Sequence, residues 1–183
     1  QTTFTYMTEA GMRPRHPASG AKQPMSVAFV KEPNEDQVEA LPERDLGTDP
    51  NFVTSRGLAG LDAQIASSER ALEEARAAND KIAVAMINRD LRYWRARRAT
   101  AQLTVPTAAG PLVQFGHRVE IEREDGKVQS YRIVGIDEAD PNEGLISYLS
   151  PLARQLVGKE VGDTLRAGPS EAEIVSIAID DES

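Results

Sequence analysis

Residues 55–103 carry a helical pattern that limits the possible folds of this chain more than any other feature. Thr54 and Ser55 offer hydroxyl groups that can cap the start of a helix. Beyond them, residues recur at alternating spacings of three and four, which is the period of a coiled-coil seam. In the first half, the seam comprises Leu58, Leu61, Ile65, Ser68, Leu72, Ala75 and Asn79. In the second half, it comprises Ile82, Met86, Tyr93, Ala96, Thr100 and Leu103, with Arg89 or Asp90 at the seam position between Met86 and Tyr93.

A turn near the middle of this pattern predicts two antiparallel arms. Asn79, Asp80 and Lys81 are the best candidates, because Asn and Asp tolerate the left-handed conformation and hydrogen-bond their own backbone. An acidic first arm would also attract a basic second arm. The alternative is one uninterrupted helix that dimerises, since neither glycine nor proline occurs in residues 61–103.

Charged residues on the two arms are candidates for contact with a partner. Carboxylates beside the turn could form an acidic tip, although solvation alone also explains them. The tip candidates are Glu73, Glu74, Asn79, Asp80 and Lys81. The basic second arm could contact acidic residues of a partner or nucleic acid, although arginine is also a strong helix former. Its candidates are Arg89, Arg92 and Arg95.

The N-terminal segment predicts little fixed structure. It is rich in Pro, Gly, Glu and Asp and shows no sustained apolar period, so it cannot bury enough surface to offset the entropy of ordering. Pro42 and Pro50 also oppose helix formation. We therefore expect residues 1–51 to form a disordered tail and linker.

Residues 111–180 predict a small α+β domain. Ser150 and Pro151 suit the start of a short helix, and Gly158 suits its end. Mostly antiparallel strands with one helix on one face are typical of the α+β class. The pattern predicts strands around residues 115–121, 128–134, 145–149 and 172–179, a turn at residues 124–127, and a helix over residues 152–157.

Composition excludes several classes of function. The net charge is -8 and the pI is about 4.9, so any contact with nucleic acid must be local. The chain has no cysteine, its histidines, His16 and His117, lie far apart, and it lacks a phosphate-binding glycine loop. We expect no metal site, no cofactor and no enzyme activity of its own. No apolar run could span a membrane, and the expected location is the cytoplasm.

Short blocks of residues in the C-terminal part carry a resemblance to a known family. They are Ser130-Tyr131-Arg132-Ile133-Val134-Gly135, Asp137-Glu138-Ala139-Asp140, Leu145-Ile146-Ser147, Ser150-Pro151-Leu152-Ala153-Arg154 and Gly158-Lys159. In order and spacing they resemble the C-terminal domain of the Gre transcript-cleavage factors, GreA and GreB. Residues 52–58 likewise resemble the start of the Gre coiled coil. Met25 opens a phrase similar to the start of short Gre-like proteins, so residues 1–24 are expected to lie upstream of the native start.

The resemblance implies a partner and a division of the chain. Residues 111–180 would form a small FKBP-like domain that docks at the secondary channel of bacterial RNA polymerase. Residues 52–105 would form a coiled-coil hairpin inside that channel, so contact with nucleic acid would be indirect and the protein monomeric. The docking residues that the resemblance implies are Asp137, Glu138, Ser150, Pro151, Leu152 and Arg154.

The tip of the hairpin departs from the family. Gre factors carry an acidic motif there, and its two carboxylates help to hold a second Mg²⁺ in the polymerase active centre. Here Asp80 alone occupies the tip, beside Lys81. Each arm is also shorter by about two turns, which withdraws the tip by about 10 Å. Mg²⁺ would therefore matter only if the tip reached the polymerase active centre.

These features predict a transcription elongation regulator that occupies the secondary channel without stimulating transcript cleavage. One alternative is a cleavage-stimulating factor that uses Asp80 with Glu73 or Glu74. The other is a protein similar to Rnk, a short-hairpin relative that is associated with nucleoside diphosphate kinase. Hairpin length separates the three, because it is greatest for cleavage factors and smallest for Rnk.

Overall fold

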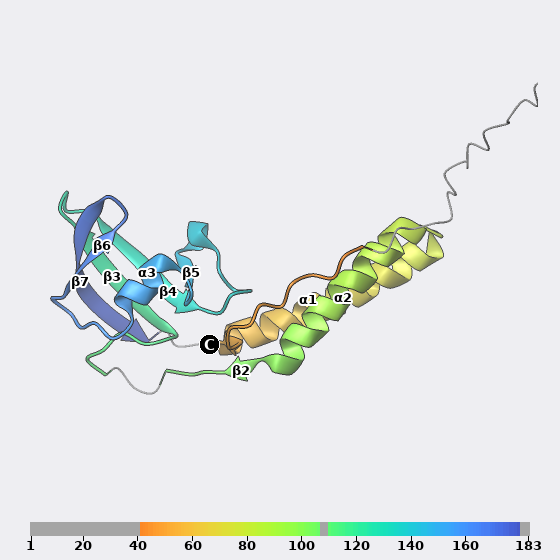
Figure 1. Ribbon diagram of the computed structural model, residues 1–183, viewed down its shortest axis with the longest axis horizontal. Coiled ribbons are helices and arrows are strands. Elements are labelled where there is room, and N and C mark those ends of the chain that lie inside the picture. Colours follow the sequence, from red (N-terminus) through yellow and green to blue (C-terminus); the bar gives the residue numbers. More distant parts are fainter. Residues whose placement is uncertain (1–40, 107–109, 180–183) are drawn as a thin grey trace, which may run out of the picture. The chain divides into compact units, whose positions relative to one another are not determined.

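The computed structural model describes residues 41–106 and 110–179 and has the α+β class that the sequence predicts (Figure 1). The expected native start at Met25 lies outside these residues. Two long helices come first, and a five-stranded sheet with one short helix follows. The helices are α1 (Ser55–Ala77), α2 (Lys81–Thr100) and α3 (Pro151–Leu156). The strands of the sheet are β3 (His117–Arg123), β4 (Val128–Val134), β5 (Leu145–Ser147), β6 (Thr164–Ala167) and β7 (Ser170–Ile179).

The turn between α1 and α2 has the chemistry that the sequence predicts. Asn79 adopts a left-handed conformation with φ 55°, and Asp80 caps α2 by accepting a 2.9 Å hydrogen bond from the Ala83 N–H. The chain therefore reverses here, and the alternative of one uninterrupted helix is wrong. Ion pairs join the two antiparallel helices, because Arg95 and Arg98 on α2 each lie 2.7 Å from a carboxylate on α1. These carboxylates belong to Glu69 and Asp62.

The buried residues of α2 do not follow the seam that the sequence predicts. Ile82 and Met86 are 66% and 46% exposed, whereas Leu91, which the predicted seam omits, is 2% exposed. The cause is that α2 contacts two surfaces. Leu91 shares a hollow with Leu72 of α1, while Tyr93 contacts the loop after β4. A single helical period cannot describe a helix with two packing directions.

Short strands hold the two ends of the helix pair together. The strands β1 (Phe52–Val53) and β2 (Gln102–Leu103) are parallel, with hydrogen bonds of 2.8 Å from Gln102 N–H to Asn51 C=O and 2.9 Å from Thr104 N–H to Val53 C=O. The helical pattern that the sequence shows up to Leu103 therefore ends at Thr100, and Gln102 and Leu103 form β2 instead. Residues 41–51 have an irregular backbone, yet several of them contact α2, as described below.

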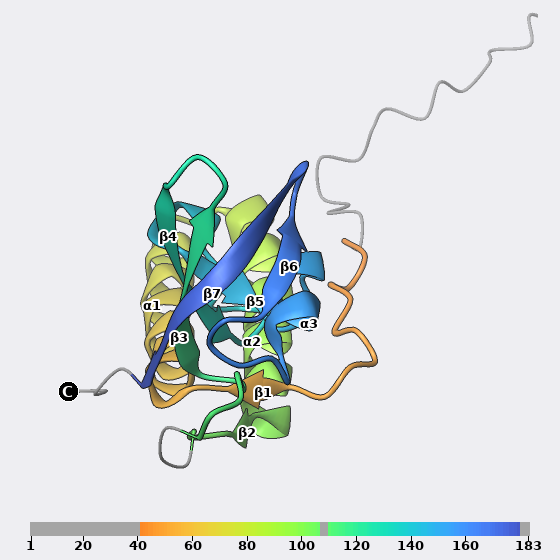
Figure 2. The same cartoon turned by 90° about the vertical axis from the view of Figure 1, so that its left-hand side faces the viewer.

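The larger sheet has the strand order β5-β4-β3-β7-β6 (Figure 2). Its neighbours are antiparallel except for β4 and β5, which are parallel. Residues 124–127 form the predicted turn between β3 and β4, where Gly126 takes a φ of 77° that suits glycine. The sequence pattern did not predict β6, because its four residues are too short to show a clear alternation.

The helix α3 packs over one face of this sheet and closes its core. The Ser150 hydroxyl accepts a 3.1 Å hydrogen bond from the Ala153 N–H, and Pro151 occupies the first turn, as predicted. Each large apolar side chain buried here contributes about 1.5–3 kcal/mol. The core comprises Val113, Val119, Ile121, Ile133, Ile146, Ala153, Leu156, Leu165, Ala167, Ala172 and Ile174.

His117 makes the stability of the sheet depend on pH. It opens β3 with no exposed surface, and its Nδ1 accepts a 3.2 Å hydrogen bond from the Gln114 N–H. Burial lowers the pKa of His117 from its usual value of 6.5. As the pH falls, His117 therefore gains a proton in the unfolded chain before it does so in the folded chain. The contribution of the neutral, buried His117 to the free energy of unfolding is complete above pH 6.5 and is lost as the pH falls below it.

We expect His117→Asn to flatten this pH dependence, because the amide oxygen can replace Nδ1 as an acceptor but does not titrate. One proton accounts for a slope of at most about 1.4 kcal/mol per pH unit. Urea unfolding of both proteins between about pH 7.5 and 5.5 measures it. Equal slopes for the two proteins would show that His117 does not carry the effect.

Candidate functional site

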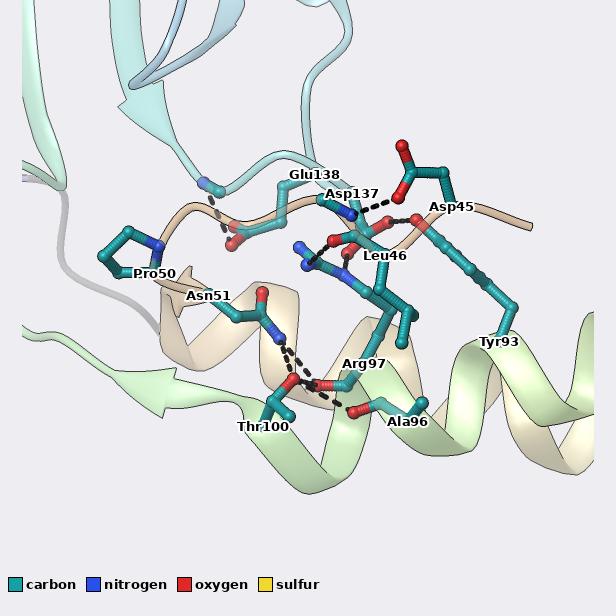
Figure 3. Close-up of polar contacts among 12 residues, drawn as sticks. Asp45, Leu46, Pro50, Asn51, Tyr93, Ala96, Arg97, Thr100, Asp137 and Glu138 are labelled. Carbon is teal, nitrogen blue, oxygen red and sulfur yellow. Dashed lines mark hydrogen bonds and ion pairs between the residues drawn. The ribbon is translucent and has the colours of Figure 1, made fainter. Parts of the chain in front are cut away.

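A buried ion pair joins α2 to the loop after β4. The Arg97 Nε donates a 2.6 Å hydrogen bond to Asp137, and the two side chains are 3% and 9% exposed. The Tyr93 hydroxyl donates a second hydrogen bond of 2.8 Å to the same carboxylate. Arg97 also donates from Nη1 to the Leu46 C=O at 3.2 Å (Figure 3). Three segments that are distant in sequence therefore meet at one guanidinium group.

Glu138 joins the same loop to the start of α1. Its carboxylate accepts hydrogen bonds from the Thr54 N–H at 2.9 Å, the Thr54 hydroxyl at 2.5 Å and the Gly135 N–H at 3.3 Å. The Thr54 hydroxyl in turn caps α1 by accepting a hydrogen bond from the Gly57 N–H. A Cβ atom on Gly57 would lie only 1.9 Å from the Glu138 carboxyl carbon. The absence of a side chain at Gly57 thus allows the carboxylate to approach the helix.

The structure therefore gives Asp137 and Glu138 partners within the chain rather than on an open surface. The resemblance to the Gre family implies instead that both contact a polymerase. Their partners Thr54, Tyr93 and Arg97 lie 40–84 residues away in sequence, so local spacing could not reveal them. Burial and the hydrogen bond to Asp137 also raise the pKa of the Tyr93 hydroxyl, which keeps that group protonated as a donor.

The predicted docking segment, residues 150–154, lies at an accessible surface. Ser150 is occupied as the cap of α3, while Pro151 and Arg154 are exposed and Leu152 is half-buried. Arg154 also borders an apolar groove, which the sequence analysis did not predict. The groove is lined by Phe52, Phe115, Tyr148, Leu149, Arg154 and Val157.

Three aromatic rings line this groove. Phe52 lies 6.0 Å from Phe115 and 5.4 Å from Tyr148, measured between ring centroids, and Tyr148 donates a hydrogen bond to the Pro50 C=O. Aromatic residues are only 5% of the chain, yet three of them lie together in this groove. The rings come from three separate segments of the chain, so no short sequence motif predicts that they lie together.

The tip of the helix pair is exposed and polar. Asp80 uses a carboxylate oxygen to cap α2, and Glu73 lies 2.7 Å from Arg76 on α1, so two of the three predicted tip carboxylates have local partners. Glu74 and Asn79 are exposed. Across residues 41–106 and 110–179, no three His, Asp or Glu side chains are grouped so that they could hold a metal ion.

The arginines of the basic arm form ion pairs with carboxylates of the chain. Arg95 pairs with Glu69 across the helix pair, and Arg89 lies 3.0 Å from its neighbour Asp90. Arg92 pairs with Glu43, which precedes β1, at 2.6 Å. Exposed pairs of this kind each contribute about 0–1 kcal/mol.

The part of the chain that the structure describes contains no helix that is long and apolar enough to cross a membrane.

Known proteins resemble the C-terminal part of this chain. Residues 108–179 match the family model of the transcription elongation factor GreA/GreB C-terminal region. The GreA of Desulfovibrio desulfuricans is 43% identical over 75 residues, which are 40% of this chain and 46% of the relative. The GreA of Nitratidesulfovibrio vulgaris is 39% identical over 101 residues, which are 52% of this chain and 63% of the relative. The chain thus spans about half the length of the curated relatives it matches.

Two solved structures show a weak likeness to this chain. Gfh1 of Thermus thermophilus, a GreA factor homolog, has 19% identity and a TM-score of 0.35, with 71% of this chain and 99% of that chain covered. A GreA/GreB factor from Nitrosomonas europaea has 18% identity and a TM-score of 0.35, with 71% and 98% covered. The family resemblance expected from the sequence blocks is confirmed by the match of the family model and of the curated relatives. Residues 108–179 are therefore similar to the C-terminal region of the GreA/GreB transcription elongation factors.

Proposed function

We propose that this chain is a Gre-like regulator that binds bacterial RNA polymerase at its secondary channel. The observation that carries the proposal is the GreA/GreB match of residues 108–179, together with the accessible segment at residues 150–154 within them. In this proposal Pro151, Leu152 and Arg154 contact the polymerase, and Ser150 holds them in place by capping α3. The family acts through the polymerase, so the protein needs no catalytic site of its own.

The finer description of the chain belongs to the same proposal. Residues 52–105 act as a coiled-coil hairpin that enters the channel, residues 111–180 act as an FKBP-like docking domain, and residues 1–51 precede both. Asp137 and Glu138 serve docking indirectly, because they fix the loop after β4 to the helix pair. A protein that binds polymerase works in the cytoplasm, and it does so as a monomer in this proposal.

The hairpin tip supports occupancy of the channel rather than stimulation of cleavage. One carboxylate oxygen of Asp80 accepts the hydrogen bond that caps α2, and Lys81 follows Asp80 directly in sequence. Glu73 is paired with Arg76. A second Mg²⁺ requires several oxygen ligands that converge on one point. We therefore propose that the hairpin competes with cleavage factors for the channel and supplies no metal ligands.

A backtracked elongation complex tests this proposal. With Mg²⁺ and a GreA factor present, we expect added protein to suppress the shortening of RNA on a gel, and the protein alone to cause none. Rapid cleavage by the protein that Asp80→Ala abolishes would instead establish the cleavage-stimulating alternative with Glu73 or Glu74. Failure to bind polymerase at all would favour the Rnk-like alternative, whose partner is nucleoside diphosphate kinase.

A charge reversal at the docking segment separates docking from the action of the hairpin. Arg154→Glu should weaken polymerase binding by about tenfold, because it reverses the charge of an exposed residue within the proposed contact. Arg166→Glu is the matched control, since Arg166 is an exposed arginine on β6 of the same domain. Equal affinities of the two variants would remove residues 150–154 from the proposed docking surface.

A further inference from the structure

A short acidic and basic segment lies along α2 and covers its aromatic residues. Residues 43–46, named here the strap, run beside the helix pair in the orange part of the chain (Figure 1). The Arg44 guanidinium carbon lies 3.7 Å from the centroid of the Tyr93 ring and 4.8 Å from that of Trp94. Glu43, the preceding residue, accepts two hydrogen bonds from Arg92, at 2.9 and 2.6 Å.

The two contacts of the strap reproduce those of a nucleotide. A planar guanidinium on an aromatic face stacks as a nucleobase would, and a carboxylate held by the fork of an arginine takes the place of a phosphate. The helix supplies an aromatic pair and cationic side chains within a few residues, with Arg89 one turn before Arg92 and Tyr93. Aromatic platforms flanked by arginines are the usual surface for single-stranded nucleic acid.

The strap contacts a buried residue at its downstream end only. Downstream of Arg44, the Leu46 C=O accepts a hydrogen bond from the buried Arg97, and the Asn51 side chain donates to the Arg97 C=O. Upstream, the side chains of Glu43 and Arg92 are 62% and 56% exposed, so salt screens their pairing. Arg44 also pairs with Asp90 of α2 at 3.6 Å, and these two side chains are 36% and 34% exposed. The hydrogen bond from Arg92 keeps the pKa of Glu43 below its usual value, so this carboxylate stays ionised at neutral pH.

We propose that the strap is an intramolecular competitor for single-stranded nucleic acid, which binds to Tyr93, Trp94, Arg89 and Arg92 when residues 43 and 44 leave them. An acidic protein surface fits less well, because it supplies carboxylates but no planar group to replace Arg44. The net charge of -8 restricts such binding to this local face. The inference goes beyond docking to polymerase and does not depend on it, since none of these residues lies in the docking segment.

Removal of Arg44 gives the sharpest test. Arg44→Ala in the full chain deletes a positive charge, so charge alone predicts weaker binding of a labelled single-stranded oligoadenylate. Displacement of the strap predicts the opposite, a dissociation constant lower by at least about fivefold in fluorescence anisotropy at low salt. Unchanged or weaker binding would overturn the proposal.

Companion variants separate stacking from charge. Glu43→Gln should also tighten binding, and more than Glu69→Gln, which frees Arg95 of α2 from a partner on α1 rather than on the strap. Adding Arg92→Ala to Arg44→Ala should abolish the gain, provided that thermal melting shows both proteins folded. Equal binding of duplex RNA, or equal competition by polyglutamate, would show recognition of charge alone and would overturn the proposal.

Discussion

Replacing Arg97 with alanine is expected to lower the free energy of unfolding by about 3–5 kcal/mol, because it leaves the Asp137 carboxylate buried without its cation. The substitution also removes the hydrogen bond to the Leu46 C=O. Urea unfolding followed by far-UV circular dichroism measures the effect. Fluorescence of Trp94, the single tryptophan of the chain, reports on the same helix from the preceding turn.

Two further variants show whether burial is the cause. Arg98→Ala removes an exposed ion pair on the same helix, so it should cost only about 0.2–1 kcal/mol. The double change of Arg97→Met with Asp137→Leu replaces the charges by apolar groups, and it should cost less than Arg97→Ala alone. The interpretation fails if Arg97→Ala and Arg98→Ala cost the same.

Local signals in the sequence were sufficient to predict the helices and their turn. Thr54 caps α1, and Asn79 and Asp80 form the reversal, because capping and left-handed conformations depend on residues a few positions apart. The core of the sheet could likewise be predicted from the sequence, since Val119 and Ile121 alternate with polar residues in β3. Features that depend on contacts between residues distant in sequence could not be predicted in this way. The parallel pairing of β1 with β2 joins residues about fifty positions apart, and neither strand is long enough to show a period.

The candidate site shows the same limit more sharply. Arg97 stands in a row of arginines with Arg95 and Arg98, and nothing in the sequence marks it as the buried one. Its burial follows from the loop that carries Asp137, which only the folded chain brings close. Residues 41–51 were predicted to be a disordered linker because of their prolines and acids. The same composition permits an extended segment whose side chains contact α2.

Asp137 and Glu138 explain why the loop after β4 matters for the proposed function. One carboxylate is bound to α2 and the other to the first turn of α1, so adjacent residues connect both helices to the sheet domain. A regulator that docks by one part and enters a channel by another needs such a connection. The sequence blocks that resemble the Gre family include these residues, and the structure assigns them to the connection itself.

Two glycines of α1 test the Glu138 connection by opposite effects. Alanine in a helix is favoured over glycine by about 1 kcal/mol, so a substitution without steric conflict should stabilise the protein. Gly60 meets that condition, because a Cβ atom there has nothing within 4 Å. We therefore expect Gly60→Ala to raise the free energy of unfolding by about 0.5–1 kcal/mol.

Gly57→Ala should instead lower the free energy of unfolding by about 1–3 kcal/mol, although it makes the same chemical change one turn earlier. The new methyl group would displace the Glu138 carboxyl group, which cannot move without losing its hydrogen bonds to Thr54 and Gly135. In a Glu138→Ala background the conflict is gone, so Gly57→Ala should become neutral or stabilising. Urea unfolding of the four proteins closes this double-mutant cycle. A stabilising Gly57→Ala in the otherwise unchanged chain would mean that Glu138 does not lie over the first turn of α1.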